Sequence, residues 1–327
     1  MNETSITTFG LLTSGGDSAG MNAAIRAVVR AAIYHGKRVK GIRRGYRGLI
    51  DGDVIEMNAR SVSGIVNRGG TILLTARCEE FKTREGMMKA AQVIKQVGID
   101  ALIVIGGDGS YRGAHELSQL IDIPVAGIPG SIDNDIYGTD YSLGFDTAAN
   151  VALEAIDRIR DTATSHERLF LIEVMGRHAG FIALWTAIAG GAEDVLLPET
   201  STDIPALIAH LQKGKKEGKI SSIVVVAEGD EAGGAMEIAR QIGNQSGYEV
   251  RVSILGHQQR GGCPTVFDRM LGAEMGVEAV EALLRGERNI MVCKVGTEIV
   301  TRPLELAWRN RKQMDPRGPR LVKILGI

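Results

Sequence analysis

Two aspartates, Asp133 and Asp135, stand close together in the segment PGSIDND, directly after a run typical of a buried strand. A carboxylate in such a place can accept the proton of a substrate hydroxyl that attacks a phosphoryl group, and a second can hold a metal or orient the first. Ser131 adds a hydroxyl group beside them. The same residues also suit an Asx turn in which the carboxylates cap backbone N–H groups, so the segment alone leaves both interpretations open.

A glycine-rich segment, TSGGDSAGMN over residues 13–22, follows the first predicted strand. Gly15, Gly16 and Gly20 precede a helical pattern, and the free N–H groups at a helix N-terminus suit an anion. The segment contains neither the GK[ST] of a P-loop nor a GxGxxG motif. A plain strand-to-helix turn is therefore an equal alternative.

A second glycine-rich segment, IGGDGSYRG over residues 105–113, offers a different chemistry. Gly107, Gly109 and Gly113 could be taken for a loosened dinucleotide fingerprint, but the Asp108 carboxylate would repel a diphosphate unless a cation intervenes. Mg²⁺ at Asp108 would bridge phosphate oxygens and offset developing charge. A metal–nucleotide loop is favoured over a dehydrogenase loop and over a plain turn.

Arginines bracket two predicted strands. Arg168 and Arg177 flank RLFLIEVMGR, and Arg251 begins the strand that His257 and Arg260 follow. Arginine is the preferred bidentate ligand for a substrate phosphate. At ~3.3 Å per residue a strand separates Arg168 from Arg177 by roughly 30 Å, so they cannot serve one small ligand within one subunit. Arg168 and Arg251 are then either ordinary surface charges or ligands in a neighbouring subunit's site.

The elements that must position these residues alternate between apolar strands and helical patterns, which predicts an α/β fold with mainly parallel sheets. Continuous apolar character indicates strands covered on both faces. Strands that end in a glycine-containing turn are expected within residues 7–17 and 101–110, and further strands at 123–130, 169–176, 221–229 and 250–256. Helices are expected at 21–33, 111–120, 146–160, 179–189, 203–217 and 265–284. Ligands of such sheets bind beyond the carboxyl ends of the strands, and the turn-rich segment after Ile136 is the best domain boundary.

Composition excludes several classes of protein. The 327 residues carry 38 basic and 39 acidic side chains, which gives no sign of a nucleic-acid or membrane-surface partner. Glycine is in excess at 42 residues, as expected where loops wrap a ligand. Three scattered cysteines suggest neither disulfides nor a zinc site and favour a reducing cytoplasm. The first residues lack signal-peptide features, and no apolar stretch is long enough to span a membrane.

Taken together, the motifs resemble bacterial ATP-dependent 6-phosphofructokinases from about Phe9 to Leu284. The strings that carry the resemblance are LLTSGGDSAGMNAAIR, RGGTILLTARCEEF, VIGGDGS, PGSIDND, RDTATSHER, EVMGRHAG, VAEG and LGHQQRGG, in that order. The resemblance implies two Rossmann-like three-layer α/β/α domains with the active site in the cleft between them. The larger, ATP-binding domain would comprise residues 1–143 and 258–311, and the smaller, fructose 6-phosphate-binding domain residues 144–257 and 312–327.

The resemblance further implies transfer of the γ-phosphoryl group of MgATP to the C1 hydroxyl of fructose 6-phosphate, a step of glycolysis. Asp133 would be the base and Asp108 would serve Mg²⁺. The catalytic set would also include Ser131, Asp135, Arg177 and Gly15. The ATP site would be lined by Gly16, Tyr46, Arg77, Cys78, Gly107, Asp108, Gly109, Ser110 and Gly113. The sugar phosphate would contact Ser131, Ile132, Asp133, Met175, Gly176, Arg177, Glu228, His257, Gln258, Gln259 and Arg260, with Arg168 and Arg251 supplied by the adjacent subunit.

Two positions separate the possible phosphoryl donors, and a third departs from the family pattern. Pyrophosphate-dependent relatives carry an aspartate at Gly109 and a lysine at Gly130, so the two glycines favour ATP. Ser131 replaces the usual threonine and keeps the hydroxyl. Asp108 and the absence of a strict GxGxxG motif disfavour a dehydrogenase. The presence of Asp133, Asp108 and Arg177 disfavours a catalytically dead sugar-phosphate-binding or regulatory subunit.

Family members are homotetramers with an effector site between subunits for ADP or phosphoenolpyruvate. The residues that match that site are Arg26, Arg30, Arg160, Glu193 and Lys219. Ala59 and Gly64 replace a family arginine and aspartate, with Arg60 near the former, and Glu217 replaces a lysine. The substitutions predict weak allosteric control.

Overall fold

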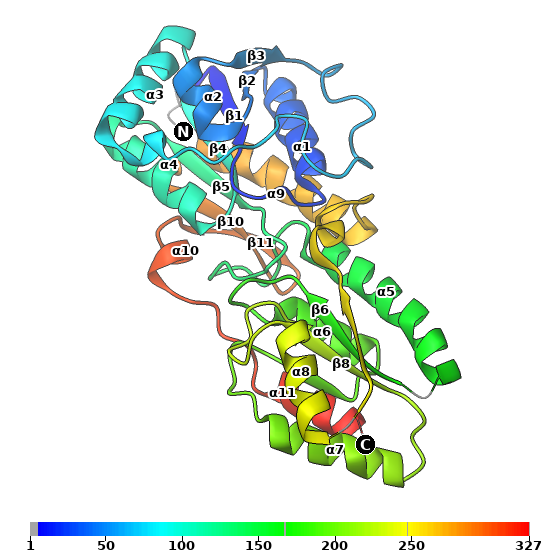
Figure 1. The fold of residues 1–327 in the computed structure, drawn as a ribbon. Helices are drawn as coiled ribbons and strands as arrows, with labels where there is room; N and C mark the ends of the chain where they lie inside the picture. The colour runs from blue at the N-terminus through cyan, green and yellow to red at the C-terminus, as the bar shows by residue number, and fades with distance from the viewer. Residues whose placement is uncertain (1–5, 167, 247, 327) are drawn as a thin grey trace. The chain divides into compact units, whose positions relative to one another are not determined.

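The computed structural model describes residues 6–166, 168–246 and 248–326. Residues 1–5, which belong to the segment without signal-peptide features, and Glu167 lie outside the described residues. The chain divides into two compact units (Figure 1): unit 1 comprises residues 1–131, 136–146 and 260–312, and unit 2 comprises 132–135, 147–259 and 313–327. Segment 132–135, which the sequence placed in the larger domain, groups with unit 2. The assignment of one ligand to each domain, and of a cleft between them, stays a prediction.

Unit 1 is built on a seven-stranded sheet with the order β11-β10-β5-β4-β1-β2-β3. Pairs β1–β2, β1–β4, β4–β5 and β5–β10 are parallel, whereas β2–β3 and β10–β11 are antiparallel. The strands are β1 (Thr8–Thr13), β2 (Arg38–Ile42), β3 (Val54–Met57), β4 (Ala101–Gly106), β5 (Val125–Pro129), β10 (Ile290–Val295) and β11 (Glu298–Pro303). The mainly parallel sheet confirms the expected fold class, and the antiparallel pairs lie at its two edges.

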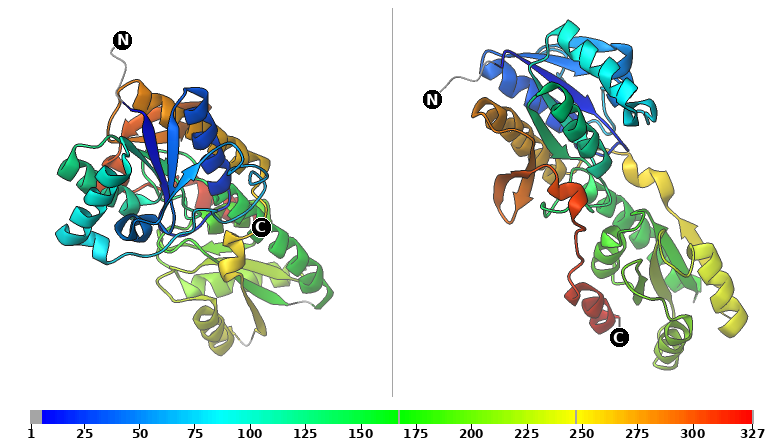
Figure 2. Two further views of the ribbon diagram at one scale, coloured as in Figure 1. Left: turned by 90° about the horizontal axis from the view of Figure 1, so that it is seen from above. Right: turned by 90° about the vertical axis from the view of Figure 1, so that its left-hand side faces the viewer.

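Helices cover both faces of this sheet because successive strand residues point to opposite sides. In β4, Ile103 and Ile105 join one core cluster, whereas Leu102 and Val104 join the other. The first cluster includes residues of α1 (Met21–Tyr34) and α9 (Val266–Leu284), which lie side by side (Figure 2). The second includes residues of α2 (Gly45–Asp51), η1 (Glu80–Lys82), α3 (Arg84–Val97), α4 (Asp108–Ile121) and α10 (Leu306–Arg309).

Close packing of α1 on α9 depends on glycine. A Cβ atom on Gly272 would lie 3.0 Å from the backbone N of Ala24, and one on Gly276 would lie 2.6 Å from Ala27 Cβ. Both distances are shorter than side chains tolerate without a shift. The glycines of α9 therefore allow the two helices to approach, and α9 begins where the Thr265 hydroxyl accepts a hydrogen bond from the backbone N of Asp268.

Unit 2 contains a four-stranded, fully parallel sheet with the order β7-β8-β6-β9. Its strands are β6 (Leu169–Val174), β7 (Asp194–Leu196), β8 (Ser222–Ala227) and β9 (Val250–Ile254). Val224 and Val226 pack against α7 (Ile204–Lys216) and α8 (Ala235–Ser246), while Ile223 and Val225 alternate with them and are fully buried. Helix α6 (Phe181–Ala189) contacts β6, β7 and β8, and α11 (Arg317–Leu325) packs against α6. Helix α5 (Phe145–His166) and the short η2 (Gly256–Arg260) complete the elements.

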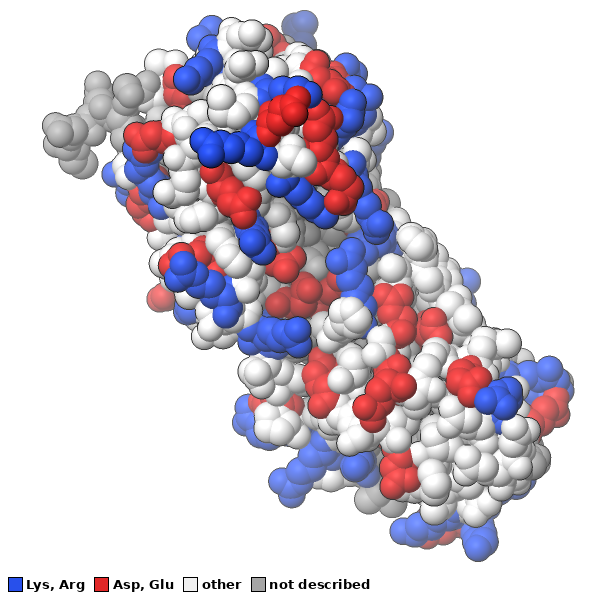
Figure 3. Space-filling view, turned by 60° about the vertical axis from the view of Figure 1, so that its left-hand side comes forward, with Lys and Arg blue, Asp and Glu red and all other residues white. Residues whose placement is uncertain are grey.

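Some expected elements differ from the observed ones. Helix α4 begins at Asp108, three residues before its predicted start at Tyr111, so Asp108, Gly109 and Ser110 lie in its first turn instead of in a loop. Helix α5 continues to His166 instead of ending near residue 160. In the described part of the chain, no helix is both long and apolar enough to cross a membrane. Lys and Arg are interspersed with Asp and Glu on the face that Figure 3 shows, in keeping with the balanced composition.

Candidate functional site

Four loops of unit 1 meet at the carboxyl end of its sheet. The Ser110 hydroxyl donates to Ser14 Oγ at 2.9 Å, which joins the loops after β1 and β4. The backbone N of Gly130 donates to the Gly106 carbonyl at 2.9 Å, which adds the loop after β5. The Thr75 hydroxyl donates to the Gly15 carbonyl at 2.7 Å and brings in the segment that contains Arg77 and Cys78. Gly15, Gly16, Gly107 and Asp108 therefore lie in one region, as the strand-end argument predicted.

The N-terminus of α4 is open to a ligand. Gly107 is the N-cap residue, and a Cβ atom on either Gly107 or Gly109 would meet no other atom within 4 Å. Asp108 lies in the first turn, where its Oδ1 accepts a hydrogen bond from the backbone N of Gly109 at 2.7 Å. No group of three or more His, Cys, Asp or Glu side chains that could hold a metal by itself occurs among the described residues. A metal at Asp108 would therefore need further oxygen ligands from a bound phosphate, which is the usual manner of Mg²⁺ binding.

Tyr46 and Phe81 pack against the N-terminal half of α4. Their rings stack with centroids 3.9 Å apart, and a Cβ atom on Gly113 would lie 3.0 Å from the Phe81 ring. Tyr46 is buried and donates from its hydroxyl to the Ser110 carbonyl at 2.5 Å; burial also raises the pKa of this hydroxyl. Tyr46 thus holds the backbone of α4, while Arg77 is exposed and Cys78 is half-buried.

The acidic segment of unit 2 faces an arginine. Asp133 is buried, and its Oδ2 lies 3.5 Å from Nε of Arg177, whose side chain is 58% exposed. Ile132 and Asn134 are also buried, whereas Asp135 is exposed. The structure therefore brings Asp133 and Arg177 together, and the neighbouring Asp135 is an exposed residue.

An unusual backbone turn presents Arg177. Its φ is 53°, in the left-handed region that non-glycine residues rarely occupy, and such conformations gather at functional sites. Gly176 has φ 145°, and a Cβ atom on it would lie 2.3 Å from the Ala179 carbonyl oxygen, so only glycine fits. The Glu228 carboxylate accepts hydrogen bonds from the backbone N of Arg177 at 2.8 Å and of Gly176 at 3.3 Å. Glu228, predicted as a substrate ligand, thus stabilises the turn that carries Arg177.

Helix η2 contains both exposed and buried polar residues. His257 and Gln258 are exposed and remain available to a ligand. Gln259 is fully buried, and its Oε1 accepts a hydrogen bond from the backbone N of Met175 at 2.8 Å. Arg260 donates to the Asp17 carbonyl at 2.9 Å, and a Cβ atom on Gly16 would lie 2.6 Å from its Nη1. Gln259 and Arg260 therefore hold two loops in addition to any contact with substrate.

Arg168 and Arg251 lie at the other end of the small sheet. Arg168 precedes β6 and Arg177 follows it, so the strand separates them as the length argument required. Leu169 pairs with Val250 and Phe170 with Arg251 in the parallel register, which places Arg168 beside Glu249. Both arginines pair with the Glu249 carboxylate: Arg168 Nη2 lies 4.0 Å from Glu249 Oε1, and Arg251 contacts the same oxygen.

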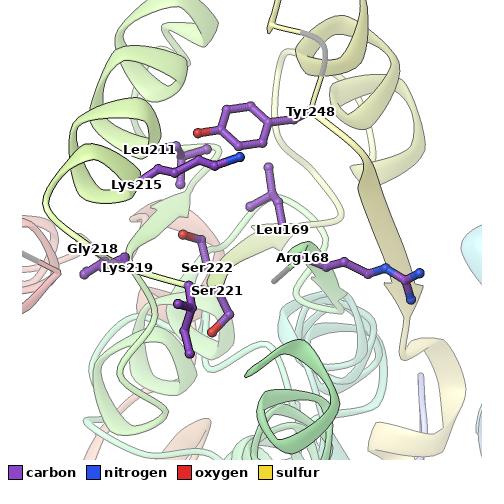
Figure 4. A pocket seen from close by; sticks show the side chains of 10 residues that line it. Arg168, Leu169, Leu211, Lys215, Gly218, Lys219, Ser221, Ser222 and Tyr248 are labelled. Atoms are coloured by element: carbon purple, nitrogen blue, oxygen red, sulfur yellow. The ribbon is translucent and has the colours of Figure 1, made fainter. Parts of the chain in front are cut away.

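The predicted effector residues occur in both units. Arg26 and Arg30 lie on α1 of unit 1. In unit 2, Arg160 donates to the Gly190 and Gly191 carbonyls, and Lys219 Nζ lies 3.7 Å from Glu193 Oε1. Lys219 and Glu193 line a small cavity of about 50 Å³ together with Glu217 and His210. A larger cavity of about 210 Å³ is lined by Lys215, Lys219, Tyr248 and Arg168 among others, and Figure 4 shows the end of the Arg168 side chain directed away from Lys215 and Tyr248.

Sequence reasoning missed the hydroxyls of Ser14 and Thr75, which join loops 96 and 60 positions apart in the chain. Ser14 directly precedes Gly15 and Thr75 lies two residues before Arg77, and a polar residue close to such a motif was the available signal. The fold and these loops together define an α/β protein whose strand-end backbone and arginines suit phosphorylated ligands.

Comparisons with known proteins identify the family. The model of the phosphofructokinase family matches residues 8–283. The chain is 54% identical over 318 residues to ATP-dependent 6-phosphofructokinase 1 of Thermus thermophilus, with 97% of this chain and 99% of that protein covered. It is 53% identical over 319 residues to ATP-dependent 6-phosphofructokinase 2 of Bacteroides thetaiotaomicron, with 97% and 98% covered. The chain belongs to the phosphofructokinase family.

A solved structure agrees with this assignment. The phosphofructokinase of Pichia pastoris in its T-state has a TM-score of 0.88 and 38% identity to this chain. The match covers 94% of this chain and 38% of that one, so the chain spans less than half the length of that larger protein. The resemblance seen in the motifs is therefore confirmed, and the fold is that of phosphofructokinases.

Proposed function

We propose that this protein is an ATP-dependent 6-phosphofructokinase, which transfers the γ-phosphoryl group of MgATP to the C1 hydroxyl of D-fructose 6-phosphate. The observation that carries the proposal is the buried Asp133 carboxylate 3.5 Å from the Arg177 guanidinium. The relatives named ATP-dependent 6-phosphofructokinase, which match almost the whole chain, support it. The products are fructose 1,6-bisphosphate and ADP, which places the enzyme in glycolysis.

Asp133 is the general base in this proposal. Its carboxylate accepts the proton of the C1 hydroxyl as the hydroxyl oxygen attacks the γ-phosphorus. Arg177 then donates to the transferring phosphoryl oxygens, where negative charge develops. The Ser131 hydroxyl orients the acceptor sugar. The exposed Asp135, two residues after Asp133, is the second carboxylate of the catalytic set.

The donor is held by unit 1. Backbone N–H groups of Gly15, Gly16 and the first turn of α4 receive the phosphates, because a helix N-terminus carries unsatisfied donors and a positive partial charge. Asp108 holds Mg²⁺ together with phosphate oxygens. Bound Mg²⁺ offsets the charge of the β- and γ-phosphates. Arg77 and Cys78 line the nucleotide side, and Tyr46 acts through the α4 backbone that it supports.

The sugar phosphate is held by unit 2 and by an adjacent subunit. Met175, Gly176, His257 and Gln258 contact the sugar, while Gln259 and Glu228 position the turn that presents Arg177. Arg168 and Arg251 bind the 6-phosphate of a neighbouring subunit's substrate, since β6 carries them away from their own Asp133. The active enzyme is accordingly a cytoplasmic homotetramer with shared sites.

ATP is favoured over pyrophosphate as the donor. Space next to Gly109 is open, and a Cβ atom on Gly130 would lie 2.9 Å from Met21 Cε. The first glycine leaves room for the nucleotide, and a lysine at Gly130 would require Met21 to move. ADP and phosphoenolpyruvate act weakly as effectors, because Glu217 places a carboxylate in the cavity that Lys219 lines.

A coupled assay tests the proposal. Purified protein is given fructose 6-phosphate with MgATP or with pyrophosphate, and fructose 1,6-bisphosphate is measured through an aldolase-linked reaction. We expect turnover with MgATP and almost none with pyrophosphate. Turnover with pyrophosphate equal to that with MgATP would reject the donor assignment, and no turnover with either donor would reject the activity.

A further inference from the structure

Asp268 is a charged residue in the core of unit 1. It lies in the first turn of α9 and is 0% exposed. A buried carboxylate costs free energy unless it is hydrogen-bonded, so its partners show what it does. One partner is Gly144, whose backbone N donates to Asp268 Oδ1 at 2.8 Å.

Gly144 closes the loop that contains the acidic segment. The residue before it, Leu143, forms a parallel bridge with Gly130, and its backbone N donates to the Pro129 carbonyl at 2.8 Å. The next one back, Ser142, donates from its hydroxyl to the Ser131 carbonyl at 2.6 Å. Asp268 therefore holds the end of the loop 131–144 at Gly144. The same end of the loop holds Ser131 through Ser142, and Ser131 stands two positions before the base Asp133 in the sequence.

The same residue packs against the glycine-rich loop after β1. A Cβ atom on Gly20 would lie 3.1 Å from the Asp268 carbonyl oxygen and 3.3 Å from Asp268 Cβ. Gly20 is the N-cap residue of α1 and ends the loop 13–20 that contains Gly15 and Gly16. A Cβ atom on Gly144 would lie 2.5 Å from Ser18 Cβ, so the two loops also touch one another.

We propose that Asp268 is a positioning residue for phosphoryl transfer: its carboxylate fixes the return of the acceptor loop at Gly144, where that return packs against the donor loop 13–20. The inference rests on the proposed function, because it assigns those loops to the donor and to the base. Asp268 touches no substrate. Its carboxylate holds the backbone of Gly144, and its carbonyl oxygen and Cβ pack against Gly20. Small misplacement of reacting groups is costly in rate, so loss of this contact lowers kcat more than it changes substrate affinity.

The test compares three variants of Asp268 in the full-length protein. Asp268→Asn keeps the size and an acceptor oxygen, Asp268→Glu moves the acceptor by one methylene, and Asp268→Leu removes it. We expect kcat to fall about tenfold or more for Leu and Glu, with KM for both substrates changed less than about threefold. Asp268→Asn should keep kcat within about threefold. Hydrogen exchange of peptides that cover 130–146 should rise in the Leu variant.

Asp100→Asn is the matched control. Asp100 also accepts hydrogen bonds from backbone N–H groups, those of Thr7 and Thr8, both at 2.9 Å, but at the start of β1, away from the strand-end loops. This control should leave kcat unchanged. A folded Asp268→Leu enzyme with unchanged kcat overturns the proposal. If Leu does not fold, equal kcat values for Glu and Asn overturn it.

The test of Asp268 can be distinguished from a test of Asp133 as the base. Asp133→Ala is measured beside these variants. If Asp133→Ala keeps its kcat while Asp268→Leu loses it, the base assignment fails and the loop-positioning role stands. If Asp133→Ala loses its kcat while folded Asp268→Leu keeps it, the proposal for Asp268 fails alone.

Discussion

Nε of Arg177 lies 3.5 Å from Oδ2 of Asp133, although the two residues are far apart in the sequence and belong to different segments of unit 2. The Asp133 side chain is 4% exposed and the Arg177 side chain 58% exposed, so a buried carboxylate is paired with a cation that faces solvent. The left-handed backbone of Arg177 and the support of Glu228 produce this arrangement. Arg177 thus contacts Asp133 and still exposes most of its side chain to solvent.

Gly109→Asp should impair nucleotide binding without unfolding the protein. A side chain at this position enters open space, and an acidic residue in the first turn of a helix is favourable for the helix itself. Beside Asp108, however, a second negative charge repels the phosphates of ATP, so KM for MgATP should rise about tenfold or more. Steady-state kinetics at saturating fructose 6-phosphate measure this.

The control for this variant is Gly243→Asp, also at a helical glycine, where a Cβ atom would meet only the Tyr248 carbonyl oxygen at 3.7 Å. Gly243 is in α8 of unit 2, and its substitution should leave KM for MgATP unchanged. Equal effects of the two substitutions would mean that Gly109 has no special relation to the nucleotide.

Mixed tetramers should reveal shared active sites. Asp133→Ala and Arg251→Ala should each be nearly inactive, whereas subunits of the two variants refolded together should recover part of the activity. Recovery requires some sites to combine an intact Asp133 with an intact Arg251 from the neighbour. The activity of purified hybrids, normalised to that of each parent, measures it.

A mixture of Asp133→Ala and Arg177→Ala is the matched control. These two side chains contact each other within one subunit, so no hybrid site can contain both intact residues, and no recovery is expected. If hybrids of Asp133→Ala with Arg251→Ala are as inactive as this control, Arg251 does not contribute to the neighbouring subunit's site.

Phosphoenolpyruvate should inhibit weakly, and fructose 6-phosphate saturation should be nearly hyperbolic. Lys219 already donates to the Gly326 carbonyl at 2.7 Å, and Glu217 adds a carboxylate to the same cavity. Glu217→Lys should strengthen inhibition by about tenfold, because it replaces repulsion by attraction toward the ligand. Saturation curves with and without millimolar phosphoenolpyruvate measure this.

Glu217→Gln separates the loss of a negative charge from the gain of a positive one. Inhibition of Glu217→Gln by phosphoenolpyruvate should be stronger than that of the unmodified protein and weaker than that of Glu217→Lys. Strongly sigmoidal curves for the unmodified protein that ADP relieves would show that Arg26, Arg30, Arg160 and Lys219 suffice for control.

Apolar runs predicted strands β1, β4, β5, β6 and β8 and the edge strand β9, but not the inner strand β10 or the strands β2, β3, β7 and β11. Strands β1, β4, β5 and β8 are mostly apolar and almost wholly buried, and β6 is apolar except for the half-buried Glu173. Strands β2, β3 and β11 mix polar with apolar residues and pair antiparallel at an edge, so no such run marks them. The start of α4 was misplaced because its glycines are typical of a loop, although an acidic residue in a first turn also stabilises a helix.

The candidate site residues were found from motifs, but their roles in holding one another were not. Arg260 reaches the Asp17 carbonyl across 243 positions of sequence, and Glu228 reaches the Arg177 backbone across 51. Such contacts depend on how distant elements pack, and a single sequence does not record that packing. The separation of Arg168 from Arg177, in contrast, follows from strand length alone and was predicted correctly.

The most direct test of the account is the kcat of Asp133→Ala, measured with fructose 6-phosphate and MgATP both saturating and compared with Arg177→Ala and the double variant. We predict that Asp133→Ala lowers kcat by ~10² to 10⁴ while binding of fructose 6-phosphate changes little. The double variant should be hardly slower than the slower single variant, because both residues act on one transition state. A kcat for folded Asp133→Ala within about threefold of the unmodified enzyme would contradict the account and return Asp133 to the role of a turn-capping residue.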